Sequence, residues 1–108
     1  MKQNDAVKSL SAMAHDGRLK LLRQLIQAGP DGILAGDLAR YAKIGATTAS
    51  AQLLVLANAG LVTSKRSGRE VRYFADYGQM RSLLSFLMED CCGKRSEICE
   101  PVAKACCG

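Results

Sequence analysis

The stretches AGDLARYA (35–42), KIG (43–45) and ATTASAQLLVLANA (46–59) follow one another in this sequence, and their spacing decides the fold. The first stretch predicts a short helix, the second a tight connection, and the third a longer helix. Gly60 is well placed to follow the end of the longer helix. Ala49, Leu53 and Leu56 are expected to face the core. Two helices joined by so short a turn have the spacing of a helix-turn-helix.

After Gly60 the pattern changes to that of short strands. Residues 61–66 and 70–75 are strand candidates, joined through Ser67-Gly68, which is a hairpin signal. Four cations fall on this hairpin within eight residues, opposed only by Glu70, and suggest a phosphate-facing surface: Lys65, Arg66, Arg69 and Arg72. A basic hairpin after a helix-turn-helix is the layout of a winged helix. We therefore expect a mainly α fold with a small β-hairpin wing.

Two helices are expected before this unit. The first carries an apolar repeat at Val7, Leu10, Met13 and Ala14. Asp16 is a candidate N-cap for the second, whose apolar stripe is Leu19, Leu22, Leu25 and Ile26. The turn residues 29–32 (GPDG) end it.

A last helix is expected after the wing. Asp76 and Gln79 have the spacing of a capping box at its start. A long apolar stripe follows, comprising Met80, Leu83, Leu84, Leu87 and Met88. We expect this stripe to pack against a second copy of the chain, with the first helix contributing; packing on the chain's own core is the alternative.

Length and composition limit the class of protein. The 108 residues and the formal charge of +5 suit one small basic domain. We assign residues 1–90 to a DNA-binding and dimerisation domain and 91–108 to a cysteine-rich tail. No apolar run is long enough for a membrane span, and the start MKQNDAVK is not a signal peptide, so we expect a cytoplasmic protein and no membrane partner. No catalytic constellation is present, and we expect no enzyme.

All five cysteines lie in the tail: Cys91, Cys92, Cys99, Cys106 and Cys107. If the last helix ends near Gly93, Cys99 can fold back toward the first pair and form a three-thiol cup. Soft thiolates select thiophilic ions, and As(III) or Sb(III) takes three ligands in a pyramid. We therefore predict a metal site at Cys91, Cys92 and Cys99, with As(III) or Sb(III) as the inducer and no cofactor required.

Other uses of the thiols remain open. Zinc prefers four ligands, commonly in C-x₂-C pairs or with histidine, and no such pair occurs here; His15 is better explained as a capping or packing residue. A redox or persulfide sensor needs a lowered thiol pKa, which Glu89 and Asp90 beside the first cysteines disfavour. A soft-metal carrier or thiol buffer is a third reading, but it leaves the helix-turn-helix and the wing unexplained.

The sequence resembles the ArsR/SmtB family of metal-responsive winged-helix repressors. The resemblance is carried by LSAMAHDGRLKLLRQL (10–25), DLARYAKIGATTASAQLLVLANAGLV (37–62) and SKRSGREVRYFA (64–75). It implies a homodimer that releases its operator when an inducer binds. The two cysteines of the classical site are replaced by Leu34 and Gly36, and residues 76–90 hold no histidine for the zinc site of other members. The segment DCCGKRSEIC (90–99) resembles the arsenic-responsive subgroup.

Residues 46–59 would then be the recognition helix in the major groove of operator DNA. Its first turns offer Thr47, Thr48, Ser50, Ala51 and Gln52. Gln52 could bond an adenine edge, and a threonine methyl could touch a thymine methyl. Helix capping is the competing role for the two threonines. The four wing cations would contact phosphates. The sequence thus predicts an As(III)-responsive repressor of an arsenic-resistance operon.

Overall fold

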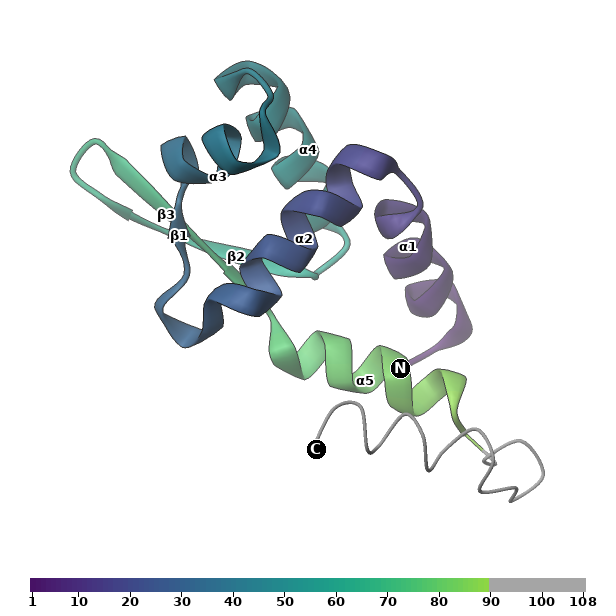
Figure 1. Cartoon of the computed structure of the whole chain (residues 1–108). Helices are drawn as coiled ribbons and strands as arrows, with labels where there is room; N and C mark the ends of the chain where they lie inside the picture. The colour runs from purple at the N-terminus through teal and green to yellow at the C-terminus, as the bar shows by residue number, and fades with distance from the viewer. Residues whose placement is uncertain (90–108) are drawn as a thin grey trace.

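The structure is a computed structural model that describes residues 1–89. Helices α1 (Gln3–Met13) and α2 (Asp16–Ala28) are followed by a short 3-10 helix (Gly29–Asp31), strand β1 (Ile33–Leu34) and helices α3 (Ala35–Ala42) and α4 (Ala46–Asn58). Strands β2 (Val62–Ser67) and β3 (Glu70–Ala75) and helix α5 (Tyr77–Leu87) complete the described part. The β2–β3 hairpin projects from the helices as a wing, and α5 lies on the other side of α2 from α3 (Figure 1). The expected winged helix-turn-helix is confirmed.

The turn between α3 and α4 depends on one left-handed residue. Lys43 caps the C-terminus of α3 with a φ of 57°, and it is the one non-glycine residue with positive φ in residues 1–89. The reversed chain lets the Ile44 amide donate to the Ala39 carbonyl at 3.1 Å, and Gly45 is then the N-cap of α4. At the far end of α4, Gly60 adopts a φ of 81° after the C-cap Ala59, as the sequence predicts.

The sheet has three antiparallel strands in the order β1-β3-β2, one more than the sequence predicts. Ser67 pairs with Glu70 across the tip, and Gly68, with a φ of 63°, takes the first loop position, where a type II′ turn needs positive φ. At the base, β1 pairs with Tyr73 and Arg72. A strand of two residues is too short to show alternation, so the prediction of a lone hairpin was incomplete.

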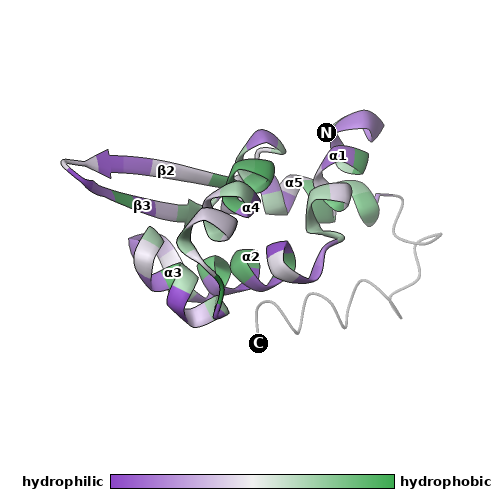
Figure 2. Cartoon of the chain, turned by 90° about the horizontal axis from the view of Figure 1, so that it is seen from above, coloured by the Kyte–Doolittle hydropathy of each residue, from purple (hydrophilic) through white to green (hydrophobic). Residues whose placement is uncertain are grey.

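The core lies where α2, α3 and α4 meet the base of the wing. Its largest fully buried side chains are leucines: Leu21, Leu22, Leu25, Leu38, Leu53, Leu56, Leu61 and Leu83. Figure 2 shows hydrophobic residues on both strands where the wing joins the helices, and hydrophilic residues toward its tip. The expected inward positions of the recognition helix, Ala49, Leu53 and Leu56, are all buried.

Helix α2 begins differently from the expectation. His15 is its N-cap, with the imidazole Nδ1 accepting from the Arg18 amide at 3.3 Å, and Asp16 is the first residue inside the helix. The assignment of Asp16 as the cap was therefore wrong by one position, whereas the capping role of His15 is confirmed. Leu19 was expected in the buried stripe but is exposed, and Leu21 takes an inward place instead.

Helices α1 and α5 each leave apolar side chains uncovered. The buried residues of α1 are Ala6, Ser9 and Ala12, and the Ser9 hydroxyl donates to the Ala59 carbonyl at 3.5 Å. Val7 and Leu10, the first two residues of the predicted apolar repeat, are 53% and 40% exposed. On α5 only Leu83 is buried, while Leu84 and Leu87 are 41% and 49% exposed. Within residues 1–89, the core therefore covers only part of these apolar stripes.

Candidate nucleic-acid interface

The recognition helix α4 presents a small, polar outer surface. Thr47, Thr48, Ser50 and Ala51 are exposed, and Gln52 is half-buried. The N-cap of α4 is Gly45, and no side chain caps that end of the helix. The two threonines are therefore not caps in the described part of the chain. Their short side chains leave the first two turns of α4 free to approach a DNA groove closely.

Gln52 differs from its neighbours because it has a partner inside the molecule. Its amide oxygen accepts from the Arg18 guanidinium at 3.3 Å. Arg18 lies in the first turn of α2, thirty-four residues away along the chain. Arg18 could not be identified from the sequence, because its contact with Gln52 joins two separate elements and leaves no local pattern. Gln52 is thus oriented before any DNA arrives.

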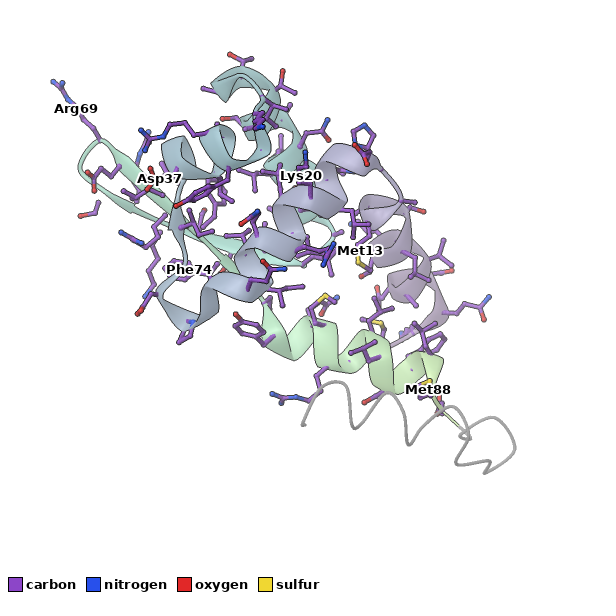
Figure 3. The ribbon with its side chains drawn as sticks, in the orientation of Figure 1. Met13, Lys20, Asp37, Arg69, Phe74 and Met88 are labelled. Carbon is purple, nitrogen blue, oxygen red and sulfur yellow. The ribbon has the colours of Figure 1, made fainter. Side chains whose placement is uncertain are left out.

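The four predicted wing cations do not lie on one surface. Paired residues of antiparallel strands share a face, so Lys65 and Arg72 lie together, whereas Arg66 shares the opposite face with Val71. Arg69 belongs to the two-residue loop and points away from the molecule at the tip (Figure 3). The hairpin therefore does not form a single flat patch of four cations that faces phosphates.

The same four cations also differ in their partners. The Arg72 guanidinium donates to the Asp31 carbonyl at 3.2 Å, and the Lys65 ammonium lies 5.9 Å from the centre of the Phe74 ring. Within residues 1–89, neither Arg66 nor Arg69 has a hydrogen-bond or ion-pair partner, and both are exposed. These two arginines are the wing cations with no competing contact in the described structure.

Further cations flank the recognition helix. Arg40 on α3 pairs with Asp37 one turn earlier, which offsets its charge. Lys43 is exposed in the turn that leads into α4. Lys43 was not among the predicted DNA contacts, because a lone lysine in a tight connection gives no pattern in the sequence. Its position adds a positive charge close to the start of the recognition helix.

The predicted thiol site lies outside the described residues. Cys91, Cys92 and Cys99, together with Cys106 and Cys107, all follow residue 89. In the part that the structure describes, no three His, Cys, Asp or Glu side chains gather as a metal site. No helix of residues 1–89 is both long and apolar enough to cross a membrane.

Comparison with known proteins gives structural neighbours only. No protein-family model and no curated protein matches the chain. A homodimeric winged helix-turn-helix domain of a possible ArsR-family regulator from Mycobacterium bovis is 27% identical over 81% of each chain, with a TM-score of 0.65. The AntR antimony-specific transcriptional repressor is 26% identical over 85% of this chain and 83% of its own, with a TM-score of 0.64.

An ArsR-like regulator from Rhodococcus shares the fold over 94% of this chain and 92% of its own, with 20% identity and a TM-score of 0.69. The two neighbours above 25% identity are a possible ArsR-family transcriptional regulator and a transcriptional repressor, in agreement with the expectation that this chain is not an enzyme.

Proposed function

We propose that this chain, by its structural neighbours an ArsR-family winged helix-turn-helix regulator of transcription, is a homodimeric repressor that As(III) or Sb(III) releases from its operator. What the neighbours have in common is a described role in regulating transcription. The nature of the inducer and the thiols that bind it are the proposal. It combines the exposed recognition helix, the wing and the cysteine-rich segment that follows α5.

The observation that carries the proposal is the position of the cysteines in the chain. Cys91 follows Leu87, the last residue of α5, by only four positions. Leu84 and Leu87 leave the apolar side of that helix uncovered, as a helix that packs against a second copy would. An ion held by Cys91, Cys92 and Cys99 would thus act at the end of a dimer helix.

The chemistry of three thiols favours the two trivalent ions. As(III) and Sb(III) are thiophilic and take three sulfur ligands, whereas structural zinc takes four. AntR, a neighbour of similar fold, is named for antimony. Release of the operator requires that the ion bind the free dimer more tightly than the DNA-bound dimer. A tenfold loss of operator affinity corresponds to a coupling free energy of about 1.4 kcal/mol.

The test is a binding titration on the DNA upstream of the gene, with and without arsenite or antimonite. We expect either ion to weaken binding of the wild-type dimer at least about tenfold, which corresponds to that coupling free energy. A variant with Cys91, Cys92 and Cys99 all changed to serine should bind DNA as before but ignore both ions. The control changes Cys106 and Cys107 to serine and should respond as the wild type does.

Two results would contradict the proposal. Release by arsenite that survives in the triple serine variant would remove the thiol site from the mechanism. Release by zinc or a persulfide donor, but by neither arsenite nor antimonite, would reassign the inducer while leaving the DNA-binding function in place.

A further inference from the structure

Arg18 contacts two helices besides its own. Its Nε donates to the Ala12 carbonyl at 2.6 Å and its Nη2 to the Ser11 carbonyl at 3.4 Å, both at the C-terminal end of α1. Its Nη1 donates to Gln52 on α4 at 3.3 Å. All three guanidinium nitrogens are thus engaged within the molecule, and the side chain is half-buried. Arg18 therefore joins α1, α2 and the recognition helix at one point.

The chemistry of the guanidinium fixes the orientation of the Gln52 amide. Arginine has five N–H donors and no acceptor, so the amide atom that faces it must be the carbonyl oxygen. The amide nitrogen then turns toward the start of α2, 4.0 Å from the point where a Cβ on Gly17 would lie. The Arg18 contact therefore selects one rotamer of Gln52 and fixes the positions of its amide oxygen and amide nitrogen before DNA binds.

The contact with α1 gives Arg18 a second attachment. The last turn of α1 carries no basic residue of its own. Besides Arg18, the Ala14 amide donates to the Ser11 carbonyl at 3.2 Å, and the His15 amide donates to the Met13 carbonyl at 2.8 Å. The Arg18 guanidinium supplies two further donors and a positive charge at this end, where the helix dipole favours a cation. Helix α1 also exposes Val7 and Leu10. Arg18 thus connects a helix with an uncovered apolar side to the helix that faces DNA.

We propose that Arg18 is a positioning residue for sequence readout, which holds Gln52 in its DNA-reading orientation and anchors that orientation to the end of α1. The inference rests on the DNA-binding half of the proposed function and is independent of the thiol site. Because the guanidinium already serves three acceptors, Arg18 acts on DNA through Gln52 and not as a phosphate ligand. It determines discrimination between sequences, whereas the wing arginines determine overall affinity.

The test measures binding of the ion-free, full-length dimer to its operator and to a scrambled duplex at several salt concentrations. Arg18→Ala should lower the ratio of the two affinities roughly tenfold, as expected for loss of one good base contact. Gln52→Ala should do the same, and the double variant should be no worse than either single variant. Arg18→Lys should also fail, because an ammonium cannot span three acceptors in a plane.

Controls separate this role from a general loss of structure or charge. Arg23→Ala removes an exposed cation from the same helix and should keep the wild-type ratio. All titrations are made well below the unfolding temperature of each variant, because loss of the contacts to α1 will lower the stability of the Arg18 variants. The slope of log affinity against log salt should stay at the wild-type value in Arg18→Ala.

Four outcomes would overturn the proposal. A slope that falls by about 0.9 would make Arg18 a phosphate contact. Additive losses in the double variant would separate Arg18 from Gln52. An Arg18→Ala protein that is less stable but keeps its ratio would leave Arg18 a purely structural role. A wild-type ratio near one would contradict operator recognition as well, whereas a dimer insensitive to arsenite would contradict only the thiol half of the proposed function.

Discussion

Gly29 is the first residue of the short 3-10 helix and Gly32 follows its last residue; the two share a backbone conformation, but the space around them differs. Gly29 has φ and ψ of 81° and −164°, and Gly32 has 68° and −169°, a region that side chains other than glycine's avoid. A Cβ on Gly29 would meet no atom within 4 Å. A Cβ on Gly32 would lie 2.4 Å from the Tyr73 carbonyl oxygen and 2.7 Å from the Phe74 ring.

Substitutions at Gly29 and Gly32 can therefore separate the cost of backbone strain, which both share, from the cost of steric overlap, which only Gly32 has. We expect Gly29→Ala to lower the free energy of unfolding by about 1–3 kcal/mol, from the backbone alone. Gly32→Ala should lose at least about 1 kcal/mol more, because the added methyl would push the start of β1 away from β3. Urea unfolding of the two variants measures the difference. Equal losses would mean that the turn can shift to make room at Gly32.

The N-caps of α5 and α2 show how well a sequence pattern predicts the role of a single residue. Asp76 was predicted to cap α5, and its carboxylate accepts from the Gln79 amide at 3.0 Å. The return bond of a capping box is absent from the described structure, because the Asp76 amide donates instead to the Leu61 carbonyl. For α2, both His15 and Asp16 could supply an acceptor, and spacing alone could not choose between them.

The wing divides into an anchored base and a free outer part. At the base, Arg72 is bonded to the Asp31 carbonyl, and β1 pairs with β3. Farther out, Ser67 and Glu70 pair only with each other across the hairpin, and Arg69 lies beyond them. The four cations of the hairpin therefore belong to two groups with different expected roles.

We expect Arg66→Ala and Arg69→Ala each to weaken binding to all DNA sequences and to reduce the salt slope by about 0.9, as for one lost phosphate contact. Lys65→Ala is the matched control. It removes a neighbouring cation that lies over the Phe74 ring, and it should change the slope less. Titrations at several salt concentrations give the slopes. Equal slopes for the Arg66 and Lys65 variants would show that DNA contacts both faces of the wing.

At this scale the sequence predicts most elements well. Both helices of the helix-turn-helix, the hairpin and the start of α5 lie within a residue or so of their predicted bounds, because each has a strong local signal in its period or its glycine. Strand β1 has no such signal. It forms because the turn at residues 29–32 brings Ile33 and Leu34 beside β3. This is a tertiary contact between segments far apart in the sequence.

At the scale of the whole molecule, residues 1–89 leave apolar side chains on α1 and α5 exposed. Helices α1 and α5 are in contact, and Val7, Leu10, Leu84 and Leu87 are all at least 40% exposed. The Mycobacterium bovis neighbour is a homodimer. We therefore expect a second copy of this chain to cover these side chains. The sequence predicts such a surface, because the apolar stripe of the last helix is longer than one small core needs.

We expect Leu87→Glu to weaken the dimer by more than tenfold, because burying one leucine contributes about 1.5–3 kcal/mol. Operator affinity should fall with it, since a monomer can occupy only one half-site. Leu19→Glu is the control, because Leu19 is a similarly exposed leucine on α2. Sedimentation equilibrium measures the association. A dimer that tolerates Leu87→Glu but is lost in Leu19→Glu would move the interface to α2.

The candidate interface was predictable in its exposed parts and not in its internal contacts. The outward positions of α4 follow from helical periodicity once Ala49, Leu53 and Leu56 are placed inward. The bond between Arg18 and Gln52 does not follow from any pattern, because it depends on how two helices cross. The wing cations were correctly found on the hairpin, but their division between two faces required the register of the strands.

Because β1 and Asp31 hold the wing only at its base, the wing can act as a lever. Of the two β3 residues that pair with β1, Arg72 is the one nearer the tip, and Arg69 lies three residues from it at the tip. At about 3.4 Å per residue, the distance from Arg72 to the tip is roughly 10 Å. A rotation of about 10° at the base would move the tip by roughly 2 Å, more than the span over which a hydrogen bond is made or lost. A small tilt of the helices thus becomes, at the tip, the difference between gripping a phosphate and missing it.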